Sequence, residues 1–193
     1  MQRYIVAITG ASGVIYGVKL AEALLTKGYE VHLVISDPAC LVMGQELGWE
    51  LGEHPEQSLR QYFPQAGLYL YNNADIAARL ASGSFLTEGM VIVPCTMSTL
   101  ASVANGLSNN LIERTADVML KERRPLVLVP RETPLSAVHL RNMLRLAEMG
   151  VAIVPAMPAF YHQPQSINEL LAFMIGKILD IMKIPNEEFA RYE

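Results

Sequence analysis

The chain has 193 residues, of which 51% are hydrophobic and 18% are charged, and its formal net charge is −4. This length suits one α/β domain with a core on both faces of a sheet. The acidic balance, and the lack of a stripe of basic and aromatic residues, argue against a nucleic-acid-binding protein. The apolar excess predicts surface buried between subunits, so we expect a homo-oligomer.

Targeting and redox signals favour a cytoplasmic protein. No apolar run approaches the roughly 18 residues that cross a bilayer, and no basic segment followed by an apolar stretch and a cleavage site opens the chain. Cys40 and Cys95 stand far apart without C-x-x-C spacing, which predicts neither a zinc site nor a disulfide framework. Cys95 has no acid or histidine nearby, so we expect a small buried residue rather than a nucleophile.

Apolar stretches of two kinds alternate along the chain. Short β-branched runs bounded by turn residues predict buried strands, and longer stretches with helical spacing predict helices. The expected strands cover residues 4–8, 29–35, 68–71, 89–94, 124–130 and 151–155. The expected helices cover residues 14–25, 37–46, 59–63, 75–80, a stretch ending at 104, 109–121, a stretch from 133 or 136 to 149, and 166–182.

This alternation predicts the fold class. Strands that alternate with helices form a parallel sheet covered on both faces. We therefore expect a three-layer, doubly wound (Rossmann-like) α/β sheet of about six strands. A single domain would span residues 1–193, with a polar C-terminal tail at about 183–193 that lies on a neighbour or in solvent.

A glycine-rich turn, Thr9-Gly10-Ala11-Ser12-Gly13, joins the first strand to the first helix. Its glycines allow close backbone approach, and the free N–H groups of the first helical turn attract an anion. Both common dinucleotide patterns fail, because Ser12 replaces a glycine of one, and Val14 and Tyr16 replace glycines of the other. Two interpretations remain: a phosphate cradle with a hydroxyl at its centre, or a tight turn without a ligand.

Polar residues also follow the later strands of the predicted sheet. They are Ser36, the turn Thr96-Met97-Ser98-Thr99, Arg131 and Tyr161. In doubly wound sheets, ligands lie beyond the carboxyl ends of the strands. The planar guanidinium group of an arginine at such a position suits a phosphate. Because so many strand ends carry polar groups, we expect a ligand site at this edge.

Other polar residues allow two interpretations each. Asp37 precedes a proline, so we expect a helix N-cap rather than a ribose ligand. Glu46 lies near the end of that helix, where the dipole disfavours an anion, so it is either solvated or held for function. Arg114 and Lys121 are two turns apart on one helix face, typical of a solvated edge. The loop at residues 81–85 is either a flexible connection or a source of hydroxyl and N–H groups for an anion.

Longer stretches of the chain resemble one known family, the UbiX-type flavin prenyltransferases, formerly described as aromatic-acid or polyprenyl-hydroxybenzoate decarboxylases. The matching stretches are Thr9-Gly10-Ala11-Ser12-Gly13 with Tyr16-Gly17, Ala81-Ser82-Gly83-Ser84-Phe85, Val93-Pro94-Cys95, residues 113–118, residues 120–135, His139-Leu140 with Asn142-Met143, and residues 158–166. The likeness covers nearly the whole chain. Residues 120–135 and the Phe-Tyr-His-Gln-Pro segment are its most specific parts.

The resemblance implies a Rossmann-like homo-oligomer, typically a dodecamer, with FMN bound between subunits. The family transfers a dimethylallyl group from dimethylallyl phosphate to N5 and C6 of the flavin without a metal, and UbiD-type decarboxylases use the prenylated FMN. By matched position, FMN would be held by Gly10, Ala11, Ser12, Ser36, Thr96, Met97, Ser98, Thr99 and Arg131. Dimethylallyl phosphate would be held by Arg114, Lys121, Arg131, Tyr161 and Lys177. The catalytic residues would be Ser12, Glu46, Lys121, Glu132 and Tyr161, with Ser12 and Glu46 assisting proton movement.

Several positions depart from the family pattern, among them Tyr192 in place of a frequent C-terminal Trp, and two other functions stay open. Lys177 stands where many members have Arg and lacks the bidentate fork, and Thr96-Met97-Ser98 replaces the commoner versions of that turn. One alternative is an FMN-dependent decarboxylase of peptidyl cysteine, which would need an active-site histidine early in the chain, whereas His32 is expected to be packed in a strand. The other is a non-catalytic FMN-binding subunit that accompanies a decarboxylase.

Overall fold

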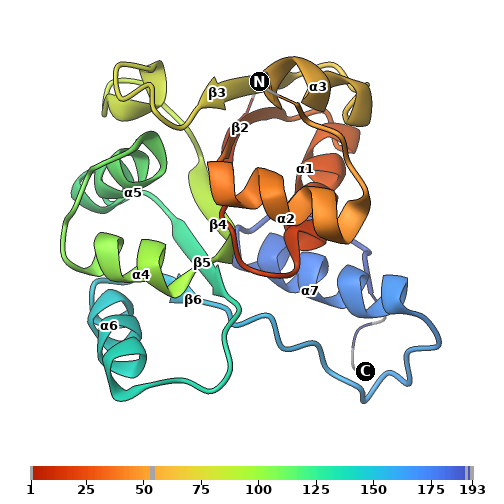
Figure 1. Ribbon diagram of the computed structural model, residues 1–193. Coiled ribbons are helices and arrows are strands. Elements are labelled where there is room, and N and C mark those ends of the chain that lie inside the picture. The colour runs from red at the N-terminus through yellow and green to blue at the C-terminus, as the bar shows by residue number, and fades with distance from the viewer. Residues whose placement is uncertain (1, 53–54, 190, 192–193) are drawn as a thin grey trace.

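The computed structural model describes residues 2–52, 55–189 and 191. In this part of the chain, seven α-helices and one 3-10 turn surround a six-stranded sheet (Figure 1). The strands are β1 (Arg3–Ile8), β2 (Glu30–Ile35), β3 (Leu68–Asn72), β4 (Gly89–Cys95), β5 (Leu126–Pro130) and β6 (Ala152–Ile153). The helices are α1 (Val14–Thr26), α2 (Asp37–Leu47), α3 (Pro55–Tyr62), α4 (Met97–Ala104), α5 (Leu111–Lys121), α6 (Ala137–Glu148) and α7 (Ile167–Ile181), and the 3-10 turn is η1 (Arg79–Ala81).

All paired strands run parallel, in the order β3-β2-β1-β4-β5-β6. Strand β1 lies in the middle, where Tyr4 is opposite Val31 of β2 on one side and Gly89 of β4 on the other. The strand order reverses between β1 and β4, so their carboxyl ends form the switch point at which such sheets bind ligands. The predicted doubly wound sheet of about six strands is confirmed.

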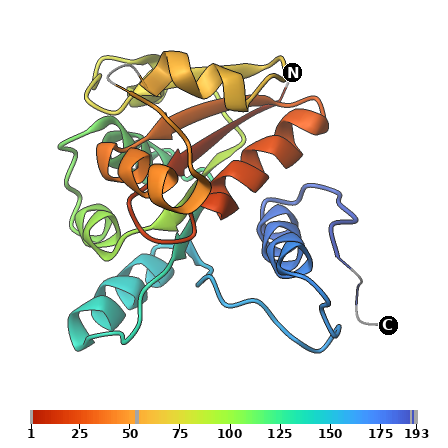
Figure 2. The ribbon, with the colours of Figure 1, turned by 45° about the vertical axis from the view of Figure 1, so that its right-hand side comes forward.

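The side chains of β1 alternate between two cores, as the two-residue period of a strand requires. Tyr4, Val6 and Ile8 belong to the core under α1, α2, α3 and α7. Ile5 and Ala7 belong to the core under α4, α5, α6 and η1. Figures 1 and 2 show these helices on the two faces of the sheet. The three predicted layers are therefore present.

For two helices, the structure shows which of two nearby residues is the N-cap. The Ser36 hydroxyl accepts a hydrogen bond from the amide N of Ala39 at 3.3 Å and caps α2. The expected cap, Asp37, was wrong, because Asp37 is already the first helical residue. Ser136, rather than Thr133, caps α6. Hydroxyl and carboxylate side chains cap equally well, so composition alone cannot separate adjacent candidates.

Two expected elements differ in the structure. The helix expected at residues 75–80 was wrong, since this stretch consists of turns that lead into η1. Asp75 accepts a hydrogen bond from the amide N of Ala77 at 3.1 Å, a local bond that competes with a helix. The last strand, expected at residues 151–155, is limited to Ala152–Ile153, and Pro155 beyond it has no N–H for a sheet.

The described part of the C-terminal tail packs on the chain's own α7. Asn186 is buried and donates a hydrogen bond to Asp180 Oδ1 at 2.9 Å. Arg191 pairs with the same carboxylate, with its Nη2 2.9 Å from Oδ1. The expectation that the tail lies in solvent or on a neighbour is therefore corrected for this part, while residues 190 and 192–193 lie outside the described residues.

His32 of β2 is fully packed in the sheet. Its Nδ1 lies 2.8 Å from the Tyr71 hydroxyl, and its ring stacks on Tyr69 with centroids 4.9 Å apart. Its Nε2 has no hydrogen-bond partner among the described residues and lies 3.9 Å from Glu30 Oε2. Burial lowers the pKa of His32 to about 4, against a smaller opposing effect of the Glu30 carboxylate.

Acid is therefore expected to destabilise the protein through His32. Its pKa is lower in the folded chain, so its contribution to the free energy of unfolding is complete above the unfolded pKa of about 6.5. That contribution, roughly 2–3 kcal/mol, is lost as the pH falls from about 6.5 to about 4. Urea unfolding at about pH 7.5 and about pH 4.5 measures it. The control is His32→Gln, which does not titrate, and an equal acid loss in both proteins would contradict the prediction.

Candidate active site

One hydroxyl ties together the two strand ends at the switch point. The buried Thr9 Oγ1 donates to the carbonyl O of Pro94 at 2.8 Å and accepts a hydrogen bond from the amide N of Thr96 at 2.8 Å. The glycine turn after β1 is thereby held against the start of α4. No local pattern in the sequence indicates this role of Thr9, because its partners lie 85 and 87 residues away.

The glycine turn packs closely on the start of α2. A Cβ on Gly10 would lie 2.4 Å from Pro38 Cβ, so no other residue fits there without a shift. Gly13 has a φ of +92°, in the left-handed region that favours glycine. Between them, Ser12 is exposed at the carboxyl edge of the sheet. The turn therefore presents the Ser12 hydroxyl where a ligand of this fold would lie.

Glu46 caps the first helix from the end of the second. Its Oε2 accepts hydrogen bonds from the amide N of Gly13 at 2.9 Å and of Val14 at 3.2 Å. Helix α1 has no side-chain cap of its own and no acidic residue in its first turn, so Glu46 supplies the negative charge that the helix dipole favours. The anion held at this expected phosphate cradle is thus the chain's own carboxylate, placed next to Ser12.

Replacing Glu46 with alanine is expected to lower the free energy of unfolding by about 1 kcal/mol, because two amide groups of α1 lose their acceptor. Urea unfolding of flavin-free protein measures the change. Gln45→Ala, at the exposed neighbouring position of α2, is the matched control. If both variants lost the same stability, the cap would not be the cause.

The turn before α4 uses two of its three hydroxyls locally. Thr96 Oγ1 accepts a hydrogen bond from the amide N of Thr99 at 3.1 Å and donates to Thr99 Oγ1 at 3.0 Å. Ser98 is exposed beside them. The first turn of a helix leaves N–H groups without intrahelical partners. Ser98 and these N–H groups therefore face the same edge as Ser12, whereas Thr96 and Thr99 hold the turn in shape.

Arg131 and Glu132 follow β5 at the same edge, and both are exposed. Glu132 Oε1 accepts a hydrogen bond from the amide N of Thr133 at 3.0 Å, which restricts the carboxylate. A largely apolar hollow of about 640 Å³ lies beside the two charged residues, and Leu135 and Met143 are among the residues that line it. The edge thus combines hydroxyl and amide donors, a guanidinium group and an apolar wall.

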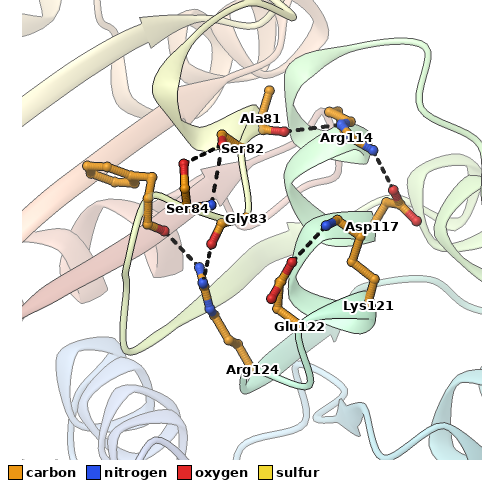
Figure 3. A network of polar contacts seen from close by, with 10 residues as sticks. Ala81, Ser82, Gly83, Ser84, Arg114, Asp117, Lys121, Glu122 and Arg124 are labelled. Atoms are coloured by element: carbon orange, nitrogen blue, oxygen red, sulfur yellow. Dashed lines mark hydrogen bonds and ion pairs between the residues drawn. The ribbon is translucent and has the colours of Figure 1, made fainter.

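A second polar cluster lies between α5 and the loop at residues 81–85 (Figure 3). Arg114 Nε donates to the carbonyl O of Ala81 at 3.2 Å, and its Nη1 lies 2.7 Å from Asp117 Oδ2. Lys121 Nζ lies 2.7 Å from Glu122 Oε1. The structure therefore brings Arg114 and Lys121 together on one face of α5, as predicted, next to a loop with two serine hydroxyls.

The two clusters lie at opposite ends of the sheet. Lys121 ends α5 just before β5 begins, and the amide N of Met90, at the start of β4, bonds to the carbonyl O of Pro125 at 2.9 Å. Lys121 is thus near the amino ends of β4 and β5, whereas Ser12 and Arg131 follow carboxyl ends. A single chain does not bring Lys121 together with Ser12 or Arg131.

Tyr161 and Lys177 occupy a third region, around α7. The Tyr161 ring meets Phe173 of α7 edge to face, with centroids 5.9 Å apart, and the residue is 54% exposed. Lys177 is exposed, and its charge contributes to the lowered pKa of Asp180, whose main cause is the hydrogen bond from Arg191. The five residues expected to hold dimethylallyl phosphate therefore lie in three separate regions of one chain.

Comparison with known proteins identifies the family. Residues 1–184 match the Flavoprotein family. The flavin prenyltransferase UbiX of Alkalihalophilus pseudofirmus is 48% identical over 188 residues, which cover 97% of this chain and 94% of that protein. This chain belongs to the UbiX family of flavin prenyltransferases.

Solved structures of the UbiX family agree with this fold. The crystal structure of AnUbiX (PadA1) in complex with FMN and dimethylallyl pyrophosphate is 43% identical, with a TM-score of 0.90, and covers 100% of this chain and 97% of that one. The dodecameric FMN-dependent UbiX-like decarboxylase from Escherichia coli O157:H7 is 40% identical, with a TM-score of 0.89, and covers 100% of both chains.

The carboxyl edge of this UbiX-family chain fits FMN by its donor chemistry. Ser12, Ser36 and Ser98 offer hydroxyls, the first turn of α4 offers N–H groups, and Arg131 offers a guanidinium group. Such donors suit the ribityl hydroxyls, ring carbonyls and phosphate of a flavin nucleotide. Within the described ranges, no group of three or more His, Cys, Asp or Glu side chains could hold a metal ion. Among the same residues, no helix is long and apolar enough to cross a membrane.

Proposed function

We propose that this protein transfers a dimethylallyl group from dimethylallyl phosphate to N5 and C6 of FMN and so makes prenylated FMN. The observation that carries the proposal is the pair of cations, Arg114 and Lys121, beside a serine loop in a chain that belongs to the UbiX family. Two cations and hydroxyl donors in one place suit a phosphate.

The carboxyl edge would hold the flavin. The residues for this are Gly10, Ala11, Ser12, Ser36, Thr96, Met97, Ser98, Thr99 and Arg131. Bound reduced FMN would supply the nucleophilic ring positions that accept the prenyl group. Glu46 is fixed by two amide hydrogen bonds beside Ser12, which supports a role for this pair in moving a proton next to the flavin.

The phosphate would be held by cations. When the allylic C–O bond breaks, negative charge grows on the leaving phosphate, and Arg114, Lys121 and Arg131 would stabilise it, with Glu132 nearby. The Tyr161 ring would stabilise the positive charge on the allyl group. Lys177 would add charge without the bidentate grip of an arginine. With several cations on one monophosphate, we propose that no metal ion takes part.

We propose that the complete site forms between copies of the chain, in a homo-oligomer like the dodecameric relative. The opposite positions of the Lys121 cluster and the Ser12 edge support this, because one copy would have to present Lys121 to the edge of another. Exposed apolar side chains on α6 also support it, since Val138, Leu140 and Leu144 are 60%, 52% and 59% exposed. Figure 2 shows α6 extending away from the rest of the molecule.

We also propose that the protein acts in the cytoplasm, in a series of reactions. Its product is a modified cofactor, so another enzyme must use it, and we propose a UbiD-type decarboxylase. Residues 1–193 would act as one flavoprotein domain. The cysteine-decarboxylase alternative loses its support from His32, because this histidine is enclosed by Tyr69 and Tyr71 in the sheet interior.

Anaerobic incubation with reduced FMN and dimethylallyl phosphate, with a chelator present, tests the proposal. Mass spectrometry of the released flavin is expected to show a gain of one dimethylallyl unit. Tightly bound but unmodified FMN would contradict the transferase and favour an accessory subunit. Decarboxylation of a cysteine-ending peptide without a prenyl donor would favour the decarboxylase.

A further inference from the structure

Arg124, in the segment just after α5, holds the loop at residues 81–85 (Figure 3). Its Nη1 donates to the carbonyl O of Phe85 at 2.7 Å, and its Nη2 donates to the carbonyl O of Gly83. Arg124 is half-buried and follows Lys121 by three residues, just beyond the end of α5. One guanidinium group therefore links the serine loop to the segment that carries Lys121.

These two bonds set the direction of the loop's polar groups. In a trans peptide the carbonyl and the next N–H point in opposite directions, so the Gly83 carbonyl on Arg124 turns the Ser84 N–H away from it. That N–H bonds to Ser82 Oγ at 3.3 Å, and the Ser82 and Ser84 hydroxyls lie 2.8 Å apart. The hydroxyl pair thus depends on the peptide that Arg124 holds.

The same loop lies directly against the lysine. A Cβ on Gly83 would lie 3.1 Å from Lys121 Nζ and would overlap Glu122 Oε1. The far end of the loop is also anchored, because the Phe85 ring packs edge-on to His32, with centroids 5.0 Å apart. A change in the position of Gly83 would therefore change the space between Lys121 and the serine hydroxyls.

We propose that Arg124 is a positioning residue for the prenyl-phosphate site: it fixes the Ser82 and Ser84 hydroxyls at their distance from Lys121. This inference rests on the proposed function and adds to it a residue that acts through the loop. The planar fork of arginine donates to two carbonyl groups at once, which the single ammonium group of lysine cannot do in the same geometry.

Arg124→Lys and Arg124→Met test the proposal, with Arg123→Lys and Arg123→Met as matched controls. Arg123 is the exposed neighbour, and its guanidinium group has no hydrogen bond or ion pair to the described residues. We expect Arg124→Met to raise the KM for dimethylallyl phosphate by about tenfold or more, with a smaller change in kcat. FMN affinity should stay unchanged, and Arg124→Lys should fall between Arg124→Met and the parent protein.

Two further readouts separate positioning from general stability. Hydrogen exchange of the peptide that contains Ser84 should be faster in Arg124→Met, while exchange in the core strands and the unfolding temperature stay near those of the Arg123 variants. A parent-like KM and parent-like exchange in Arg124→Met would overturn the proposal. Parallel losses of FMN affinity, unfolding temperature and activity would also overturn it, because they indicate a general role in folding.

The experiment also distinguishes this inference from the proposed function. If the parent protein makes no prenylated FMN, the proposed function fails. Titration with inorganic phosphate then decides the role of Arg124. Weaker phosphate binding in Arg124→Met than in Arg123→Met would support positioning of an anion site, and equal binding would overturn it.

Discussion

Replacing Lys121 with alanine is expected to lower kcat/KM for prenyl transfer by about 10²- to 10³-fold, the usual cost of removing one preorganised charge that stabilises a transition state. The Lys121 ammonium lies beside the serine loop and is paired with Glu122 at 2.7 Å, so it is held where a phosphate would meet the loop. FMN affinity is expected to stay unchanged. Steady-state prenylation rates and flavin titration measure the two effects.

Lys27→Ala is the control for Lys121, because Lys27 is an exposed lysine at the end of a different helix, α1. Arg131→Ala should differ from both and lose flavin binding together with transfer. If the site is shared between copies, co-assembled oligomers of Lys121→Ala and Arg131→Ala chains should recover activity at some sites. Retained turnover in Lys121→Ala would count against the phosphate site, and no recovery in mixed oligomers would count against sharing.

The largest expected effect on stability is that of Gly17→Ala in α1. An added Cβ would lie 2.4 Å from the carbonyl O of Val93 and 2.6 Å from Ile8 Cγ1, both in the packed core. Helix and sheet would have to separate, at a cost of about 3 kcal/mol. This exceeds the gain of about 1 kcal/mol that alanine brings to a helix interior. Urea unfolding curves measure the difference.

Gly44→Ala provides the matched control within another helix. Gly44 of α2 is exposed, and the nearest atom to an added Cβ, the carbonyl O of Trp49, would lie 3.5 Å away. Alanine there is expected to be neutral or to stabilise the protein by up to about 1 kcal/mol. A similar loss in both variants would show that the tight contact of α1 with β1 and β4 is not what requires Gly17.

The sequence by itself determined the layers of the fold and the edge at which a ligand is expected. The periods of two and 3.6 residues are local properties of strands and helices, and they separated β1 from α1 and β4 from α4. The same local spacing put Arg114 and Lys121 on one face of α5. Once strands and helices alternate, a parallel sheet with its polar strand ends at one edge follows from topology.

Only the tertiary structure decided which polar groups meet. Glu46 caps α1 across 33 residues, Thr9 joins β1 to β4 across 85 residues, and Arg124 reaches Gly83 across 41 residues. Local patterns do not record such pairs, because they depend on how the packed layers are placed relative to one another. The structure also separated Lys121 from Ser12. A helix that connects two parallel strands ends near the amino end of the next strand, opposite the carboxyl ends at which Ser12 lies.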